Sequence, residues 1–251
     1  MKKIALLALG LMSLLLLSSQ AVAVEPQGPP SPGVELKFWA MEDTYITERY
    51  GNTNYGSEEY LRVRDKQTDT SNLFSRSLLK FDQQDLVNKL AGKQILSASL
   101  HLYEYSRDGA TSLADEIDLF RVTSDWAEND VTWNTSPTFA TQRTAYRTFD
   151  GDDTTPGWRK WEDDLINIVQ WWIDGVQNNF GLMLENDLDQ LYNQMNVKFR
   201  SSEYLVPDGS SGIYRPYLKI TVIPEPASAI LFGIGSGLIG IFTARRRKAR
   251  S

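Results

Sequence analysis

Few residue types in this chain could perform acid–base or nucleophilic chemistry. Among 251 residues there is one histidine, His101, and no cysteine. The absence of cysteine excludes thiolate nucleophiles, disulfides and Cys-ligated zinc. A serine triad would have only His101 as its base, yet His101 falls on the outward face of a predicted strand, and no serine stands in a Gly-x-Ser-x-Gly turn. No glycine-rich phosphate loop is found either. The sequence therefore predicts no nucleophilic or phosphate-handling active site.

Carboxylates are the remaining candidates for chemistry. A pair of Asp or Glu side chains can hydrolyse or cleave a polysaccharide, but a chain with this many acids brings some pair together by chance. The densest acidic loop contains Asp150, Asp152 and Asp153. Its oxygens could bind Ca²⁺, although the spacing differs from that of an EF-hand. No other metal and no other cofactor is predicted.

Basic and aromatic residues form a second candidate site. In each predicted strand, the residues between the apolar positions face outward. Arg binds carboxylates through two parallel hydrogen bonds, and Tyr offers a flat ring with a polar tip. This combination suits an acidic polysaccharide such as a uronate polymer, whereas the alternative is an ordinary exposed sheet surface whose charges prevent aggregation. The candidate ligand-binding residues are Arg62, Arg64, Tyr103, Tyr105, Lys198 and Arg200.

These residues must be positioned by strands, because apolar and polar residues alternate with period two along the middle of the chain. The longest such run, 96–105, places Leu96, Ala98, Leu100 and Leu102 toward the core. Helical spacing predicts short helices at Asp163–Asp174 and Gln83–Leu90. Many short strands with little helix predict an all-β fold, an antiparallel β-sandwich or jelly roll with one or two short helices. The other predicted strands are Phe38–Met41, Thr44–Thr47, Tyr60–Arg64, Ser77–Phe81, Ile117–Val122, Phe180–Leu184, Asn196–Arg200 and Tyr217–Val222.

The charge argues against a nucleic-acid partner. The whole chain has a formal net charge of −6, and without the seven basic residues of its two ends and Glu225 the middle carries −12. A surface this acidic repels nucleic acid. About 190 residues suffice for one domain with a substantial core.

The N-terminus has the three parts of a secretory signal peptide. Lys2 and Lys3 precede the apolar run Ile4–Leu17, and the small residues of Ala21-Val22-Ala23 follow. We expect signal peptidase to cleave after Ala23. Residues 24–35, rich in Pro and Gly, are predicted to be a linker to a domain over 36–223.

The C-terminus combines three features. Pro224, Glu225 and Pro226 precede the uncharged stretch Ala227–Ala244, and the basic cluster Arg245, Arg246 and Arg247 follows directly. As a helix the stretch would measure about 27 Å, enough to cross a bilayer, and the basic residues would stay in the cytoplasm. We therefore expect a transmembrane helix over 227–244 with the domain on the far side of the inner membrane.

These features in this order resemble the PEP-CTERM sorting signal of Gram-negative bacteria, over residues 224–251. The resemblance implies recognition by an exosortase and removal of the tail. It also implies a protein that passes from the inner membrane to the cell surface or the extracellular matrix, in association with exopolysaccharide.

The densest internal motif is Asp125–Pro137, with the sequence DWAENDVTWNTSP. Trp126 and Trp133 could cover the open end of the core, which is the more ordinary role, or stack on sugar rings. Glu128 could hold the loop by accepting backbone N–H bonds. The motif residues singled out are Asp125, Trp126, Glu128, Thr132, Trp133 and Asn134.

Five further runs occur in register with this motif and together resemble the DNRLRE domain, a relative of carbohydrate-binding modules. They are Asp43–Ile46, Asn54–Gly56, Leu61–Asp65, Leu79–Asp82 and Arg215–Leu218. The resemblance implies a non-catalytic β-sandwich over about 39–222, here without the polysaccharide-degrading domain that such modules accompany. We therefore expect an exported, non-catalytic module that binds polysaccharide in an exopolysaccharide or biofilm matrix. A structural surface protein without a glycan ligand and a carboxylate-dependent polysaccharide lyase or hydrolase are the alternatives.

Overall fold

The computed structural model describes residues 33–65, 67–68, 71–108, 115–149, 156–186, 195–206 and 213–223. The predicted signal peptide, most of the linker, the sorting signal and the acidic loop at Asp150, Asp152 and Asp153 lie outside these residues. Among the helices of the described part, none has the length and apolar character needed to cross a membrane.

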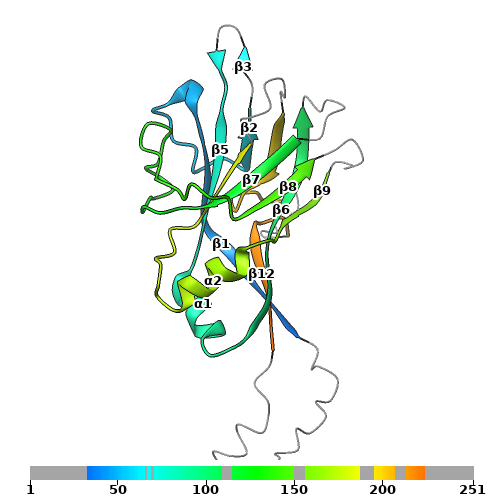
Figure 1. Ribbon diagram of the computed structural model, residues 1–251. Helices are drawn as coiled ribbons and strands as arrows, with labels where there is room; N and C mark the ends of the chain where they lie inside the picture. The colour runs from blue at the N-terminus through cyan, green and yellow to red at the C-terminus, as the bar shows by residue number, and fades with distance from the viewer. Residues whose placement is uncertain are drawn as a thin grey trace, which may run out of the picture. The chain divides into compact units, whose positions relative to one another are not determined.

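The described chain is mostly strand, with two short α-helices (Figure 1). The helices are α1 (Gln83–Leu90) and α2 (Leu165–Ile173), and a single 3-10 turn covers Glu48–Tyr50. The strands are β1 (Val34–Thr47), β2 (Tyr60–Arg64), β3 (Gln67–Thr68), β4 (Ser71–Asn72), β5 (Ser75–Phe81), β6 (Ile95–Asp108), β7 (Asp115–Arg121), β8 (Ala145–Phe149), β9 (Gly157–Trp161), β10 (Leu182–Asn186), β11 (Asn196–Arg200) and β12 (Tyr217–Val222).

Every strand pairing is antiparallel. Within the described residues, ten strands form one sheet in the order β1-β12-β6-β11-β2-β5-β10-β7-β8, with β9 attached to β6, while β3 and β4 pair separately. Strand β1 also pairs with β5, because a register shift between Ala40 and Glu42 lets its first half follow β12 and its second half follow β5. The sheet thereby folds over on itself and encloses a core. The predicted all-β sandwich is confirmed.

The main core lies between the two halves of the folded sheet. On β2, β5, β11 and β12 the alternation predicts an inward-facing set of apolar residues, and all are buried there: Leu61, Val63, Leu79, Phe81, Val197, Phe199, Leu218, Ile220 and Val222. On β6 one prediction is wrong: Leu96 is 44% exposed and Ile95 packs against the core instead. The reason is a bulge, since Thr221 pairs with Ser97 but Val222 pairs with Ile95.

The start of β10 also differs from its prediction. Leu182 and Leu184 enter the main core, but Phe180 packs against a second cluster on the opposite face of the sheet. Gly181 separates them with a φ of +91°, and a Cβ at this position would lie 2.0 Å from the Leu79 carbonyl oxygen. Only glycine allows this turn and this close approach.

The two helices pack against each other and close one end of the main core (Figure 1). Helix α1 begins at Asp82, whose carboxylate accepts hydrogen bonds from the Gln84 and Asp85 backbone N–H groups at 2.8 and 3.1 Å. Helix α2 buries the predicted apolar residues and leaves Trp171 40% exposed. The predicted α2 residues that are buried are Leu165, Ile168, Val169 and Trp172.

A second apolar cluster lies on the outer side of β5 and β10. It consists of Ile46, Leu78, Val122, Trp126, Val131 and Met183, with Trp133 and three phenylalanines packed at its margin. The residues 123–141 pass over this face and cover it. Trp126 and Trp133 therefore cover the side of β5 and β10 that points away from the main core. They do not cover the open end of the main core, as was predicted.

The burial of Trp126 leads to a stability prediction. Its side chain is 7% exposed, and its indole N–H donates to the Phe180 carbonyl oxygen at 2.8 Å. We expect Trp126→Ala to lower the free energy of unfolding by about 3 kcal/mol or more, because it opens a cavity and leaves that carbonyl unpaired. Urea denaturation measures this loss. Trp171→Ala, which truncates an exposed indole, is the control and should change stability by about 0.5 kcal/mol or less; equal losses in the two variants would contradict the assignment.

Candidate functional site

The loop 125–137, called here the motif loop, is held in place by the other sequence motifs. Lys80 donates to the Trp126 carbonyl oxygen at 2.5 Å and to Asp125 Oδ1 at 3.2 Å. Asn54 Nδ2 donates to the Glu128 and Val131 carbonyl oxygens at 2.6 and 2.8 Å. Lys80 thus points away from the main core, as predicted, but lies beneath the motif loop and not in open solvent.

Glu128 has the role that the sequence suggested. Its Oε1 accepts the Asp43 backbone N–H at 2.8 Å, and its own N–H donates to Glu42 Oε2 at 3.1 Å. A Cβ on Gly56 would lie 2.6 Å from the Glu128 carbonyl oxygen, so only glycine permits this approach. These contacts join the motif loop to β1 and to the turn before β2.

The second half of the motif loop is held in the same way. Thr132 and Thr135 exchange backbone-to-hydroxyl hydrogen bonds at 2.9 and 3.3 Å. Asn134 donates its backbone N–H to Gly51 and its amide to Asn52 Oδ1, at 3.0 and 2.7 Å. Trp133 lies under the Arg76 guanidinium at 4.8 Å. The motif residues thus either stabilise the loop internally, as Thr132 does, or attach it to the sheet and to the turn at Gly51 and Asn52.

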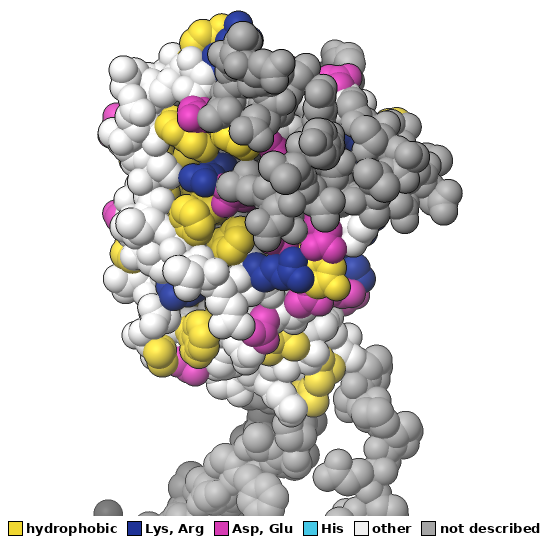
Figure 2. All heavy atoms as spheres, turned by 45° about the horizontal axis from the view of Figure 1, so that its top comes forward, with side chains coloured by type: hydrophobic (Ala, Val, Ile, Leu, Met, Phe, Trp, Pro, Cys, Tyr) yellow, Lys and Arg dark blue, Asp and Glu magenta, His cyan; other side chains and the backbone are white. Residues whose placement is uncertain are grey.

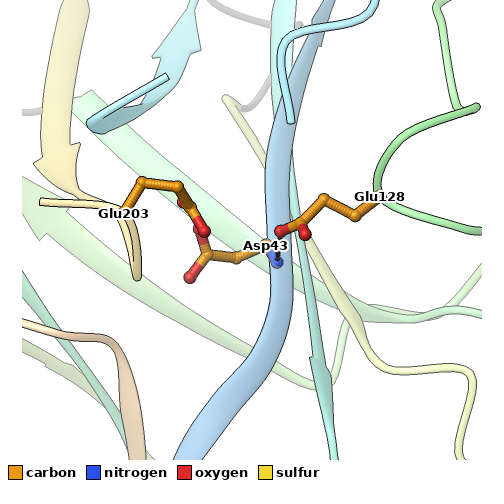
Figure 3. Close-up of side chains that lie close together, drawn as sticks. All are labelled: Asp43, Glu128 and Glu203. Atoms are coloured by element: carbon orange, nitrogen blue, oxygen red, sulfur yellow. Dashed lines mark hydrogen bonds between the residues drawn. The ribbon is translucent and has the colours of Figure 1, made fainter. Parts of the chain in front are cut away.

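Three carboxylates meet where the motif loop, β1 and the segment after β11 come together. Asp43, Glu128 and Glu203 place their carboxylate oxygens within 4.8 Å of one another. In Figure 3, Asp43 is turned toward Glu203, while Glu128 approaches from the other side of β1. Such oxygens are the ligands that Ca²⁺ and Mg²⁺ take. The hydrogen bonds that these carboxylates make connect segments of the fold: Asp43 accepts the Ser202 N–H, and Glu128 accepts the Asp43 N–H.

Two carboxyls of this cluster, Asp43 and Glu128, have raised pKa values. Burial, reinforced by the negative charge of Glu203, raises the pKa of the Asp43 carboxyl well above its ordinary value, and the Ser202 N–H opposes this only in part. Burial also raises the pKa of Glu128. In the native protein a proton therefore binds more tightly here than in the unfolded chain.

The cluster predicts how stability depends on pH. Because the folded-state pKa of Asp43 is raised, its contribution is fully present below the unfolded pKa of about 4 and is lost as the pH rises through the folded value. Asp43→Asn mimics the protonated acid and keeps an acceptor for Ser202. We expect the variant to lose less thermal stability than the wild type between about pH 4 and pH 8.

Melting temperatures measured across this range test the prediction. Asp130→Asn removes an exposed carboxylate from the same loop and serves as the control, with a pH profile like that of the wild type. Parallel profiles for Asp43→Asn and the wild type would show that the cluster does not retain a proton.

The six candidate ligand-binding residues lie on three adjacent strands, β2, β11 and β6. One surface of the sheet points away from the main core and is called here the outer face. It is formed by β2, β11, β6, β12, β9 and the first half of β1. On it, Lys198 pairs across with Arg62, and Asn196 pairs with Arg64. Arg200 stands between two tyrosine rings, 3.9 Å from the Tyr105 centroid and 3.7 Å from the Tyr204 centroid.

The four basic candidate residues on β2 and β11 form no salt bridge with the residues that the structure describes. Arg62 donates to Asn196 Oδ1 at 3.0 Å, and Lys198 lies 4.9 Å from the Tyr60 ring centroid. Within the described part of the chain, Arg62, Arg64, Lys198 and Arg200 form no salt bridge. Burial, followed by the neighbouring charges of Arg62 and Arg49, lowers the pKa of Arg64. Positive charge is therefore concentrated here, opposed at Arg64 by Asp108, and this favours an anionic ligand.

Aromatic residues that the sequence did not single out extend this surface. Tyr103 contacts Tyr214 on one side and Trp158 on the other, with centroids 4.1 and 5.5 Å apart, and Tyr214 in turn lies 6.0 Å from Tyr204. Trp158 belongs to β9, a strand that the alternation pattern did not predict. Figure 2 shows hydrophobic side chains beside Lys and Arg side chains on one face of the molecule.

Comparison with known families agrees with this architecture. The model of carbohydrate-binding module family 96 matches residues 34–208, and the model of the PEP-CTERM protein-sorting motif matches residues 222–248. The chain thus belongs to carbohydrate-binding module family 96. Its sorting motif marks it as a secreted protein that is processed and exported to the cell surface or the extracellular space. No curated protein matches the chain in sequence. The predicted relationship to carbohydrate-binding modules and the predicted sorting signal are confirmed.

Proposed function

We propose that this protein is a non-catalytic module that binds a carboxylated polysaccharide at its outer face, in the matrix or on the cell surface to which it is exported. The observation that supports this most is the set of four basic residues that form no salt bridge with any described residue, interleaved with tyrosines on three neighbouring strands. Membership of a carbohydrate-binding family supports the class of ligand.

The proposed binding depends on local charge. The middle of the chain carries a net charge of −12, so the protein as a whole repels an anionic polymer. Attraction must come from the patch itself, where Arg62 and Arg200 can each pair with a carboxylate through two N–H groups. Tyr60, Tyr103 and Tyr105 supply flat surfaces against which sugar rings can pack.

Affinity electrophoresis in gels containing alginate or polygalacturonate tests this proposal. We expect the wild-type protein to be retarded, and the retardation to decrease with added salt, because exposed charges are screened over about 8–10 Å near physiological ionic strength. The double variant Arg62→Ala with Arg200→Ala should bind about tenfold more weakly or worse, since two charge-assisted contacts are lost.

A charge-matched control separates a specific patch from net charge. Lys89→Ala with Lys93→Ala removes two positive charges from α1 and the turn after it, away from the outer face, and should leave retardation unchanged. Absence of retardation of the wild type in either gel would overturn the proposed ligand. Equal loss in both double variants would overturn the proposed site.

We also propose that exosortase cleavage depends on Glu225. The sorting motif spans this residue, and the flanking Pro224 and Pro226 favour an extended backbone that a protease cleft can accept. Glu225→Ala should leave the tail attached and the protein in the inner membrane. Mass spectrometry of the surface protein identifies the mature C-terminus, with Ser228→Ala as the control that is still processed; a wild-type protein ending at Ser251 would contradict the proposal.

A further inference from the structure

Two exposed tryptophans share one part of the outer face. Trp39 on β1 is 41% exposed, and Trp158 on β9 is 39% exposed. Each ring centroid lies 5.2 Å from that of Tyr217 on β12, at interplanar angles of 62° and 68°. The two indoles are therefore no more than about 10 Å apart, on either side of a buried tyrosine that holds both in place.

The elements beneath these rings explain their position. Tyr217 pairs with Trp39 on one side and with His101 on the other, and its ring stacks on the His101 ring at 4.7 Å with an interplanar angle of 2°. Strand β9 brings Trp158 opposite Tyr103. The four strands β1, β12, β6 and β9 thus present a row of aromatic rings that is rigid because every ring contacts another ring.

Positive charge surrounds this row. Lys37 lies 4.5 Å from the Tyr217 centroid and makes no ion pair with any described residue. Lys219 and Lys160 belong to the same face but are paired with Glu35 and Glu162 at 3.0 and 2.7 Å. Burial first, and then the charges of Lys219, Lys160 and Lys37, lower the pKa of His101 to about 4. Lys37 is thus the cation beside this row that no described carboxylate neutralises.

We infer that Trp39 and Trp158, supported by the buried Tyr217 between them, form a second carbohydrate subsite, on which pyranose rings of the carboxylated polysaccharide stack while Lys37 meets a carboxylate. This inference rests on the proposed function. A polar or charged surface would leave the apolar faces of sugar rings without contact, whereas exposed indoles with a cationic rim complement both the rings and their acid groups.

The aromatic subsite is continuous with the basic patch, which is the group formed by Arg62, Arg64, Lys198 and Arg200. Trp158 contacts Tyr103, Tyr103 contacts Tyr214, and Tyr204 then leads to Arg200. One polymer chain can occupy both parts, so that the two subsites act together and strengthen each other's binding. The ligand is therefore an extended polysaccharide and not a single sugar.

The double variant Trp39→Ala with Trp158→Ala tests the subsite, with alginate and polygalacturonate as probes. We expect affinity to fall about tenfold or more, with a salt dependence like that of the wild type because Arg62 and Arg200 remain. The conservative double variant Trp39→Tyr with Trp158→Tyr keeps flat rings and should restore most of the affinity. Trp171→Ala, which removes an equally exposed indole from α2, should bind like the wild type. Melting temperatures confirm that all variants are folded.

The outcomes separate the subsite from the proposed function. If the wild type binds and the double variant Trp39→Ala with Trp158→Ala binds equally well, the subsite is overturned and the basic patch remains as the proposed site. A wild type that binds neither polymer overturns both. Sedimentation analysis that shows a dimer for the wild type and a monomer for the double alanine variant would show that a second copy covers the indoles, which also overturns the subsite.

Discussion

Strands β5 and β10 carry apolar side chains on both faces, and water must be excluded from both. Leu79 and Leu182 fill the main core, while Leu78 and Met183 face the other way. A two-faced apolar sheet is stable only if something covers its outer side. The motif loop provides this cover, and the bonds from Lys80, Asn54 and Asp43 hold it there. Because this side is closed, the outer face of the opposite half of the sheet is the extended strand surface left to meet a ligand.

A buried charge network keeps that outer face in register. Glu104 on β6 is fully buried and accepts hydrogen bonds from Arg107 at 2.8 Å and from Arg159 on β9 at 2.5 Å. A buried carboxylate without these partners would cost several kcal/mol. The network therefore ties β9 to β6 at one position, next to the register shift between β6 and β11. The placement of Trp158 opposite Tyr103 follows from this pairing.

The motif loop serves structure, because Trp126, Glu128 and Asn134 make internal contacts there. Arg62, Arg64 and Tyr217 belong to two other runs of the family resemblance and lie on the outer face. The residues proposed to bind polysaccharide lie on the other half of the sheet, on β2, β11, β6, β1 and β9. Under the proposed function, the chemistry of the outer face, and not the motif loop, selects the polysaccharide.

By itself the sequence determined the all-β class, both helices, the inward residues of β2, β5, β11 and β12, and the sorting motif at the C-terminal end. These depend on local periodicity and composition, which are visible in the sequence. It also indicated that Arg62, Lys198 and Tyr105 face outward. Only the tertiary structure decided that their strands are neighbours, because pairing between distant strands leaves no local signal. Strand β9 escaped detection because Arg159 is buried beside Trp161 while Trp158 is exposed, which breaks the usual alternation of apolar and polar residues. The bulge at Ile95 and the location of the motif loop were likewise set by contacts with distant segments, whose geometry no run of residues contains.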